Sequence, residues 1–283
     1  RAIRAAQFAA RLEFAIAPET MALCRTLDLD GLARERMMGE MEKALTRSRR
    51  PSRCFEALRE MGQLEPWLKE VAALIGVKQR ADCHPEGDAW THTMLVVDEA
   101  AKLRDEAKNP TGLMLAALLH DVGKAVAMQE KDGVIHAYGH ETAGVPLAED
   151  FLRRLTGEKA LCRYVLNMVE LHMKPNLYAA QNSGQKAWNR LFDRSACPED
   201  LLLLAKADHR GRINAAPYAE TERTIRARLS AYEEMMARPH ITGADLLARG
   251  IQPGEEMGRL LEEAHRLRLA GVKKEDALRQ MRL

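Results

Sequence analysis

Histidine and aspartate side chains stand next to each other at the end of a strongly apolar segment in the middle of the chain. His120 and Asp121 follow a run of leucine and alanine residues, and Gly123 and Lys124 come shortly after them. Imidazole and carboxylate groups are suitable ligands for Zn, Fe, Mn, Ni or Co ions. Gly123 lets the backbone approach another segment closely, and Lys124 falls one helical turn after His120. The adjacent pair alone indicates a metal site only weakly.

Four more segments strengthen that indication. Each places a histidine or an aspartate near the end of a predicted helix, and these residues are His92, His140, His172 and Asp208. Side chains from facing helices can converge on one cavity in a helical bundle. The set therefore predicts a cavity that could bind a divalent ion, with Ni, Mn, Co, Fe, Zn and Mg as candidates.

Basic residues accompany the predicted ligands in the sequence and could contact a phosphate group. A divalent ion lowers the pKa of bound water and neutralises the charge that develops during phosphate ester hydrolysis. Positively charged side chains beside such an ion can bind phosphate oxygens; the candidates are Lys124, Lys174, Arg210 and Arg212. Each of these can equally be a solvated surface charge. Asp121 and Lys124 are the predicted catalytic residues, and the other histidines are expected in surface or satisfied polar positions: His84, His136, His209, His240 and His265.

The elements that must position these residues are almost all predicted to be helices. Ala, Leu, Met, Arg and Glu dominate, and alternating runs of Val, Ile and Thr are scarce. We therefore expect an all-α protein with helices over residues 2–14, 19–26, 31–46, 52–61, 64–75, 89–107, 110–121, 141–156, 158–172, 185–194, 199–209 and 217–237. The expected domains are an RNA-binding-like neck and body, a metal-binding domain and a helical tail, over residues 1–78, 79–215 and 216–283.

The order of the six predicted ligands, with a glycine shortly after the His-Asp pair, resembles the signature of the HD superfamily of metal-dependent phosphohydrolases. The likeness covers about residues 84–215. It implies an all-α core in which one ion is held by His92, His120, Asp121 and Asp208. The remaining histidines, His140 and His172, resemble the additional ligands of binuclear members, with Asp121 bridging the two ions.

The flanking segments resemble a second family, the bacterial tRNA nucleotidyltransferases (CCA-adding enzymes) and poly(A) polymerases. Residues 1–20 form an arginine-rich pattern that ends in Phe-Ala-Ile-Ala-Pro-Glu-Thr and resemble the neck helix of that family. Residues 32–45 and 53–64 resemble its helical body. Residues 84–92 resemble the HD domain that is fused to some bacterial members, and residues 241–258 resemble their tail.

This second resemblance implies that tRNA or another RNA is a partner of the chain. Arginine is suited to phosphate contacts, and the predicted RNA- or nucleotide-binding residues outside the metal centre are Arg1, Arg4, Arg11, Arg47, Arg49, Arg50 and Arg53. The stretch from Arg47 to Arg53 can also be read as a solvated loop.

The part of that family that adds nucleotides is expected to be missing from this chain. It requires a Gly-Ser followed by an Asp-x-Asp on a strand, which holds Mg²⁺. Asp28-Leu29-Asp30 has the spacing but neither the preceding Gly-Ser nor a strand pattern, and it is predicted to be a turn beside a helix. The chain also opens inside a helical pattern at Arg1, as a fragment would.

Composition excludes several other classes of protein. The 43 Lys and Arg residues are balanced by 41 Asp and Glu residues, which excludes a polybasic tail protein. The five cysteines are dispersed and the sequence has no apolar run long enough to cross a bilayer. We therefore expect a cytoplasmic protein with no membrane partner.

Three functions remain open at this point. The chain can be a phosphohydrolase acting on phosphoesters of nucleotides or RNA ends, a non-hydrolytic tRNA-binding module that supports CCA addition by the missing head, or a degenerate scaffold that binds nucleotides without turnover. The intact ligand set argues against the third function. The first two use different residues and can coexist in one polypeptide.

Overall fold

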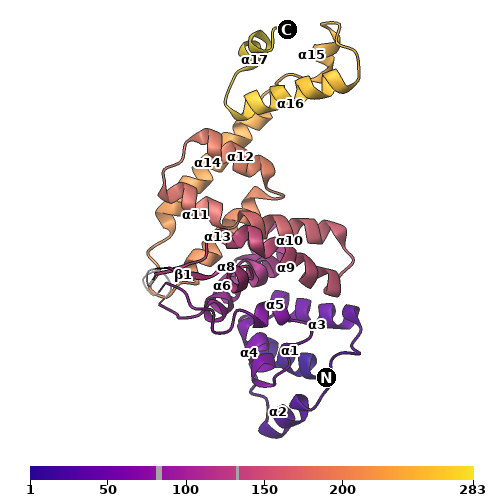
Figure 1. Ribbon diagram of the computed structural model, residues 1–283, viewed down its shortest axis with the longest axis vertical. Coiled ribbons are helices and arrows are strands. Elements are labelled where there is room, and N and C mark those ends of the chain that lie inside the picture. The colour runs from indigo at the N-terminus through magenta and orange to yellow at the C-terminus, as the bar shows by residue number, and fades with distance from the viewer. Residues whose placement is uncertain (81–84, 132–133) are drawn as a thin grey trace. The chain divides into compact units, whose positions relative to one another are not determined.

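A computed structural model describes residues 1–80, 85–131 and 134–283, and it confirms the expected all-α fold class (Figure 1). The chain divides into two compact units. One contains residues 1–176 and 195–219, and the other contains residues 177–194 and 220–283. The first residue of the predicted 84–92 motif, His84, lies outside the described residues.

The N-terminal part of the first unit is built from four amphipathic helices and one short helix. They are α1 (Ala2–Leu12), α2 (Pro18–Arg25), α3 (Arg34–Arg47), α4 (Ser52–Glu60) and α5 (Lys69–Ala72). Helix α1 packs against α3 and α4. The predicted helix over residues 64–75 is wrong, because only α5 is helical there. Pro66 precedes it and has no amide hydrogen to continue a helical ladder.

The rest of the first unit surrounds one buried helix, α7 (Pro110–Leu119). Every residue of α7 from Gly112 to Leu119 is buried, as expected for a helix that is apolar on all sides. Its neighbours include α3, α6 (Ala89–Leu103), α10 (Lys159–Leu171) and α13 (Pro198–Arg210). The chain that leaves the C-terminal end of α7 therefore lies in the interior of the unit, and this is where His120 and Asp121 follow.

Polar contacts fix the start of α7 and of α6. The Asn109 side chain accepts a hydrogen bond from the Gly112 amide at 2.9 Å and caps α7. The buried Asp200 carboxylate accepts hydrogen bonds from the Lys108 and Asn109 amides and from the Tyr164 hydroxyl. Asp88 caps α6 in the same way, through the Thr91 amide at 2.9 Å.

The described residues between α7 and α10 form two helices and a small hairpin. Helix α8 (Lys124–Ala127) is followed by strands β1 (Gln129–Lys131) and β2 (Val134–His136), which pair antiparallel with Gln129 opposite His136. Helix α9 (His140–Leu155) follows and packs against α10 (Figure 1). The hairpin was not predicted, because strands of three residues are too short to show an alternating pattern.

The chain continues through the second unit. Helix α11 (Met173–Ala180) crosses the boundary between the units, and α12 (Gln185–Arg194), α14 (Ala219–Ala237), α15 (Gly243–Leu247), α16 (Glu255–Leu269) and α17 (Lys274–Gln280) follow. One core of this unit is formed by Ile241, Leu246, Ala264, Ala277 and Leu278. Among the described residues, none of the helices has both the length and the apolar character that a bilayer span requires.

Candidate metal centre

The six predicted ligands lie together in the interior of the first unit. His92 is in the first turn of α6, and His120 and Asp121 follow α7. His140 begins α9, His172 follows α10, and Asp208 is in the last turn of α13. All six are buried, with His92, His120 and His172 at 0% exposure. Side chains from five helices thus meet at one point.

Asp121 lies at the centre of this arrangement. Its Oδ1 atom is 3.1 Å from His140 Nε2 and 3.7 Å from His172 Nε2. Its Oδ2 atom is 3.2 Å from His120 Nε2 and 3.8 Å from His92 Nε2. Two groups of possible metal ligands result, and both contain Asp121. Asp208 lies at the edge of the first group, with its Oδ1 atom 3.1 Å from His92 Nε2.

Three of the four histidines share one hydrogen-bond pattern. Their Nδ1 atoms lie 2.7–2.9 Å from the backbone carbonyl three residues earlier, on Ala117, Val169 and Ala137. A carbonyl oxygen can only accept, so we assign the proton of each neutral imidazole to Nδ1. The Nε2 atom then carries a lone pair, and it is this atom that faces Asp121.

His92 follows the same rule with a carboxylate in place of the carbonyl. Its Nδ1 atom lies 2.8 Å from Glu86 Oε1, and the side chains of both residues are buried. The other carboxylate oxygen of Glu86 accepts a hydrogen bond from the Ile213 amide. Carboxylates commonly orient metal-ligating histidines in this way. Glu86 was not predicted as a site residue, because six residues before a histidine is not a recognisable spacing and only the fold brings the two together.

The lone pairs leave the centre suited to a cation. His140 Nε2 and His172 Nε2 are 3.4 Å apart, and both face Oδ1 of Asp121. His120 Nε2 is buried and has no hydrogen-bond partner among the described residues. Nitrogen lone pairs and carboxylate oxygens that face one another are satisfied by a positive ion between them. The donor set therefore fits divalent metal ions.

The electrostatics of the centre keep its carboxylates ionised. Burial acts to raise the pKa of Asp121, but the neighbouring His120 and Lys124 and a hydrogen bond with His140 hold that pKa well below its usual value. Burial opposes the shift of Asp208 in the same way, and His92 and Arg212 outweigh it. Burial and the neighbouring His120 lower the pKa of His172 to about 3, so this ligand is neutral near pH 7.

Of the four predicted phosphate-binding residues near the centre, the structure brings two to it. Lys124 Nζ is 2.6 Å from Asp121 Oδ2 and 2.5 Å from Gln79 Oε1. Arg212 contacts Asp208 Oδ2 at 3.4 Å. Lys174 is half-buried and Arg210 is exposed, and neither is among the described residues that line the adjoining cavity.

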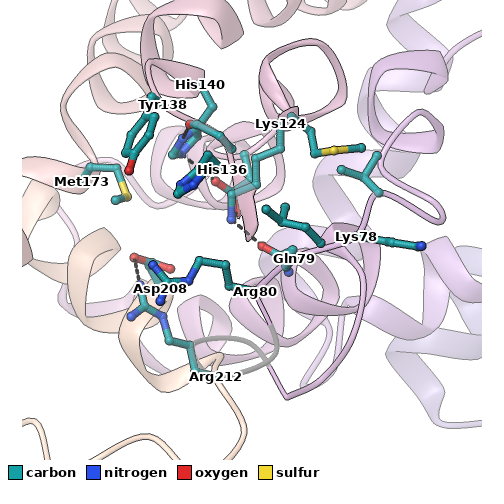
Figure 2. Close-up of a pocket in the computed structure, with 15 residues that line it drawn as sticks. Lys78, Gln79, Arg80, Lys124, His136, Tyr138, His140, Met173, Asp208 and Arg212 are labelled. Atoms are coloured by element: carbon teal, nitrogen blue, oxygen red, sulfur yellow. Dashed lines mark hydrogen bonds and ion pairs between the residues drawn. The ribbon is translucent and has the colours of Figure 1, made fainter. Parts of the chain in front are cut away.

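That cavity has a volume of about 220 Å³ and opens beside the metal centre (Figure 2). Asp121, His140 and Asp208 lie in its wall. Its other lining residues are Val77, Lys78, Gln79, Arg80, Lys124, Met128, Ile135, His136, Ala137, Tyr138, Met173 and Arg212. Figure 2 shows Lys124 reaching Gln79 and Arg212 reaching Asp208 on its inner side. The cavity therefore gives a substrate access to the buried ligands.

The predicted RNA-binding arginines lie in helices α1, α3 and α4, at the start of the chain, and in the loop between α3 and α4, and none of them lines this cavity. Six are exposed, and Arg11 is half-buried. The guanidinium groups of Arg4 and Arg11 lie 5.4 and 5.0 Å from the centre of the Phe8 ring. Arg50 has a structural contact as well, because its Nε atom is 3.1 Å from the Asp98 carboxylate of α6. Besides Arg50, the predicted RNA-binding arginines are Arg1, Arg4, Arg11, Arg47, Arg49 and Arg53.

Comparison with known proteins gives two family matches. Residues 89–270 match the HD domain family, and residues 13–75 match the family described as the probable RNA and SrmB-binding site of polymerase A. The chain is 38% identical to the multifunctional CCA protein of Burkholderia cenocepacia (strain HI2424) and 35% identical to that of Burkholderia pseudomallei (strain K96243). It is 33% identical to the multifunctional CCA protein of Actinobacillus pleuropneumoniae serotype 5b (strain L20).

These alignments cover 96% of this chain and 64–66% of the length of each relative. They confirm both resemblances that the sequence motifs suggested.

Proposed function

Because this chain belongs to the HD domain family, we propose that its buried centre is a metal-dependent phosphohydrolase site acting on phosphoesters of nucleotides or RNA ends. One observation carries the proposal: four imidazoles turn their Nε2 atoms toward the two oxygens of one ionised carboxylate. The arrangement leads into a cavity with positively charged side chains, as a phosphate ester requires.

The residues fall into two sets around Asp121. His92, His120 and Asp121, with Asp208 beside them, would hold one ion, and Asp121, His140 and His172 would hold a second. A bound divalent ion supplies an activated water and neutralises phosphate charge.

The protein's own side chains have separate tasks in this proposal. Lys124 balances the charge of Asp121 and presents an ammonium group to a phosphate oxygen in the cavity. Arg212 fixes Asp208, and Glu86 keeps the His92 ring in the orientation that turns Nε2 inward. Asp121 is the most sensitive position, since both ligand groups depend on it.

Asp121→Ala tests the proposal. The purified chain is loaded with Mn²⁺, Ni²⁺, Co²⁺ or Zn²⁺, and phosphate release from mono- and diesters is measured with and without a chelator. We expect turnover that the chelator abolishes, and complete loss in Asp121→Ala with the helical circular dichroism retained. Asp150→Asn, an exposed carboxylate on α9, is the matched control and keeps full activity. Turnover by Asp121→Ala with normal metal content would show that the site is misassigned.

We propose a second function for the N-terminal helices, supported by the match of residues 13–75 to an RNA-binding family. In this proposal residues 1–78 and the tail bind tRNA and support CCA addition by the portion of the relatives that this chain does not span. The two functions use different surfaces, so the loss of one leaves the other intact.

A further inference from the structure

Residues 47–53, called the arginine segment below, join α3 to α4 and divide sharply into an inner and an outer side. All four arginines of the segment are exposed, whereas its other residues are buried. These buried residues are Ser48, Pro51 and Ser52. The side chains of all these arginines except Arg50 make no hydrogen bond or ion pair with another described residue. The backbone of the segment is therefore docked on a neighbouring element, while its guanidinium groups face solvent.

Asp98 of α6 holds the C-terminal half of the arginine segment. Its carboxylate is 8% exposed and accepts hydrogen bonds from the Ser52 amide at 3.0 Å, the Ser52 hydroxyl at 2.8 Å and Arg50 Nε at 3.1 Å. A buried carboxylate fixes the donors around it, because each lost contact would leave a charged oxygen unsatisfied. Arg50 uses only its Nε atom in this contact, so the Nη atoms of its guanidinium group can still bind a phosphate.

Arg104, the residue directly after α6, holds the N-terminal half of the segment. Its Nη1 atom donates hydrogen bonds to the backbone carbonyls of Leu45 at 3.1 Å and Ser48 at 2.6 Å. These carbonyls lie in the last turn of α3 and directly after it, where the helix has no amides left to satisfy them. The guanidinium group thus caps α3 and fixes the point at which the chain leaves this helix.

Both supporting residues lie outside residues 13–75, the part of the chain that matches an RNA-binding family. They belong instead to the part that matches the HD domain family, and α6 also carries the predicted metal ligand His92. A third side chain of α6 contacts the same neighbour, because Trp90 Nε1 donates a hydrogen bond to Glu56 Oε1 of α4 at 2.8 Å. Helix α6 and the residue after it therefore support α3, α4 and the segment between them.

We propose that Asp98 and Arg104 are positioning residues for RNA, which hold the arginine segment in the conformation that binds phosphates. The proposal rests on the RNA-binding function proposed for the N-terminal helices and extends it to residues beyond them. A loose segment would have to be ordered at the moment of binding, and this ordering would reduce the affinity. The alternative is that Asp98 only neutralises Arg50, and its negative charge would then weaken the attraction for phosphates.

Asp98→Ala distinguishes the two views, because they predict effects of opposite sign. Loss of a negative charge alone would leave tRNA affinity unchanged or raise it, whereas loss of positioning should lower it about tenfold, the cost of ordering one or two long side chains. Filter binding of a tRNA transcript is measured at several salt concentrations. Because all four arginines remain, the plot of log affinity against log salt should shift downward with its slope unchanged. Arg104→Met removes the donors to α3 and should give the same parallel shift.

Two further variants separate positioning from a general loss of stability. Asp98→Asn keeps an oxygen for the Ser52 amide and an NH₂ group that can donate to the Ser52 hydroxyl, so it should restore most of the affinity. Glu70→Ala is the matched control, because it removes another buried carboxylate that pairs with an arginine, Arg154, and does not contact the arginine segment. It should leave tRNA affinity unchanged.

Hydrogen exchange of the Ser52 amide, measured without RNA, should be faster in Asp98→Ala than in the wild type. Should Asp98→Ala lose its helical circular dichroism, Ser52→Ala removes only one hydroxyl contact and should lower tRNA affinity by a smaller factor.

Wild-type or higher tRNA affinity in Asp98→Ala overturns the proposal, as does an equal loss in Glu70→Ala or in Asp98→Asn. An unchanged exchange rate at Ser52 also overturns it. The underlying RNA-binding function is judged separately on the wild-type chain. Absence of tRNA binding, or binding that survives neutralisation of all four arginines, would overturn that function and the positioning role together.

Discussion

At the scale of single residues, each histidine ligand is oriented by a contact of its Nδ1 atom, on the side of the ring that faces away from Asp121. Glu86 does this for His92 with one oxygen and holds the Ile213 amide with the other. Both partners are donors, so both oxygens of Glu86 must accept. A glutamine at this position has only one acceptor and would place its NH₂ group against a second donor.

Glu86→Gln should therefore weaken metal binding by about tenfold, the lower end of the effect seen for outer contacts of metal ligands. The affinity is measured by competition with a chelator of known strength. Glu141→Gln is the matched control, because Glu141 lies 3.8 Å from His140 Nδ1 while that atom already contacts the Ala137 carbonyl. Equal losses in the two variants would exclude a specific role for Glu86.

The number of ions is also decided by individual residues. Replacing His140 and His172 together by alanine should leave one ion per chain where the wild type holds two, because the first ligand group remains complete. Metal analysis after dialysis gives the stoichiometry, and anomalous scattering from Mn²⁺-soaked crystals should give two peaks about 3.5–4 Å apart in the wild type. A single peak in the wild type would show that His140 and His172 do not hold a second ion and instead contact a phosphate group.

The ligands could be predicted from sequence, whereas their supporting residues could not. His92, His120 and Asp208 stand in a recognisable order along the chain. Glu86 contacts His92, and Gln79 contacts Lys124, only after the chain has folded. Ligands can be predicted from residue type and order along the chain, whereas contacts between residues that only the fold brings together cannot.

At the scale of secondary-structure elements, the second ligand group depends on how closely α9 approaches the end of α7. A Cβ atom on Gly123 would lie 2.0 Å from the carbonyl oxygen of His140 and 2.5 Å from the amide nitrogen of Gly144. Both are backbone atoms, so a methyl group can be accommodated only if the start of α9 moves away. That movement would carry His140 away from Asp121.

Gly123→Ala should accordingly weaken the site formed with His140 and destabilise the fold by about 1–3 kcal/mol, as overpacking does. Metal stoichiometry and urea unfolding report the two effects. Gly184→Ala, where a Cβ atom meets nothing within 4 Å, is the control and should change neither. A Gly123→Ala protein with full metal content and wild-type stability would contradict the close approach of these helices.

The elements that sequence predicted best are the long ones. Composition and periodicity indicated α6, α10 and α13 because their packing faces repeat over several turns. Helix α11 was missed because it begins directly after His172, without a loop to mark it. The hairpin that carries His136 was missed because its strands are short.

At the scale of the whole molecule, RNA binding and hydrolysis are expected to respond to different conditions. Arginine side chains that bind phosphates release counterions, so tRNA affinity should fall steeply as salt increases. Neutralising Arg47, Arg49, Arg50 and Arg53 should flatten the plot of log affinity against log salt by about 0.7–0.9 for each phosphate that is no longer neutralised. Part of any effect on stability would come from Arg50, because it also pairs with Asp98.

Filter binding of a tRNA at several salt concentrations measures this slope. The control neutralises four exposed basic residues of the central helices instead, Lys102, Arg153, Lys159 and Arg163, and should leave the slope unchanged. A salt-independent affinity, or equal slopes for the wild type and the four-arginine variant, would place the RNA on another surface.

The ligands of the centre are separated along the chain, from His92 to Asp208, and lie at or just beyond the ends of five different helices. Unfolding disperses them, so an ion binds the native protein and has no comparable site on the unfolded chain. Free metal at 100 times the dissociation constant would then add about 2.7 kcal/mol to the free energy of unfolding. The melting temperature should rise with metal concentration in the wild type and stay constant in Asp121→Ala. Through this linkage the lifetime of the folded protein would follow the metal supply of its surroundings.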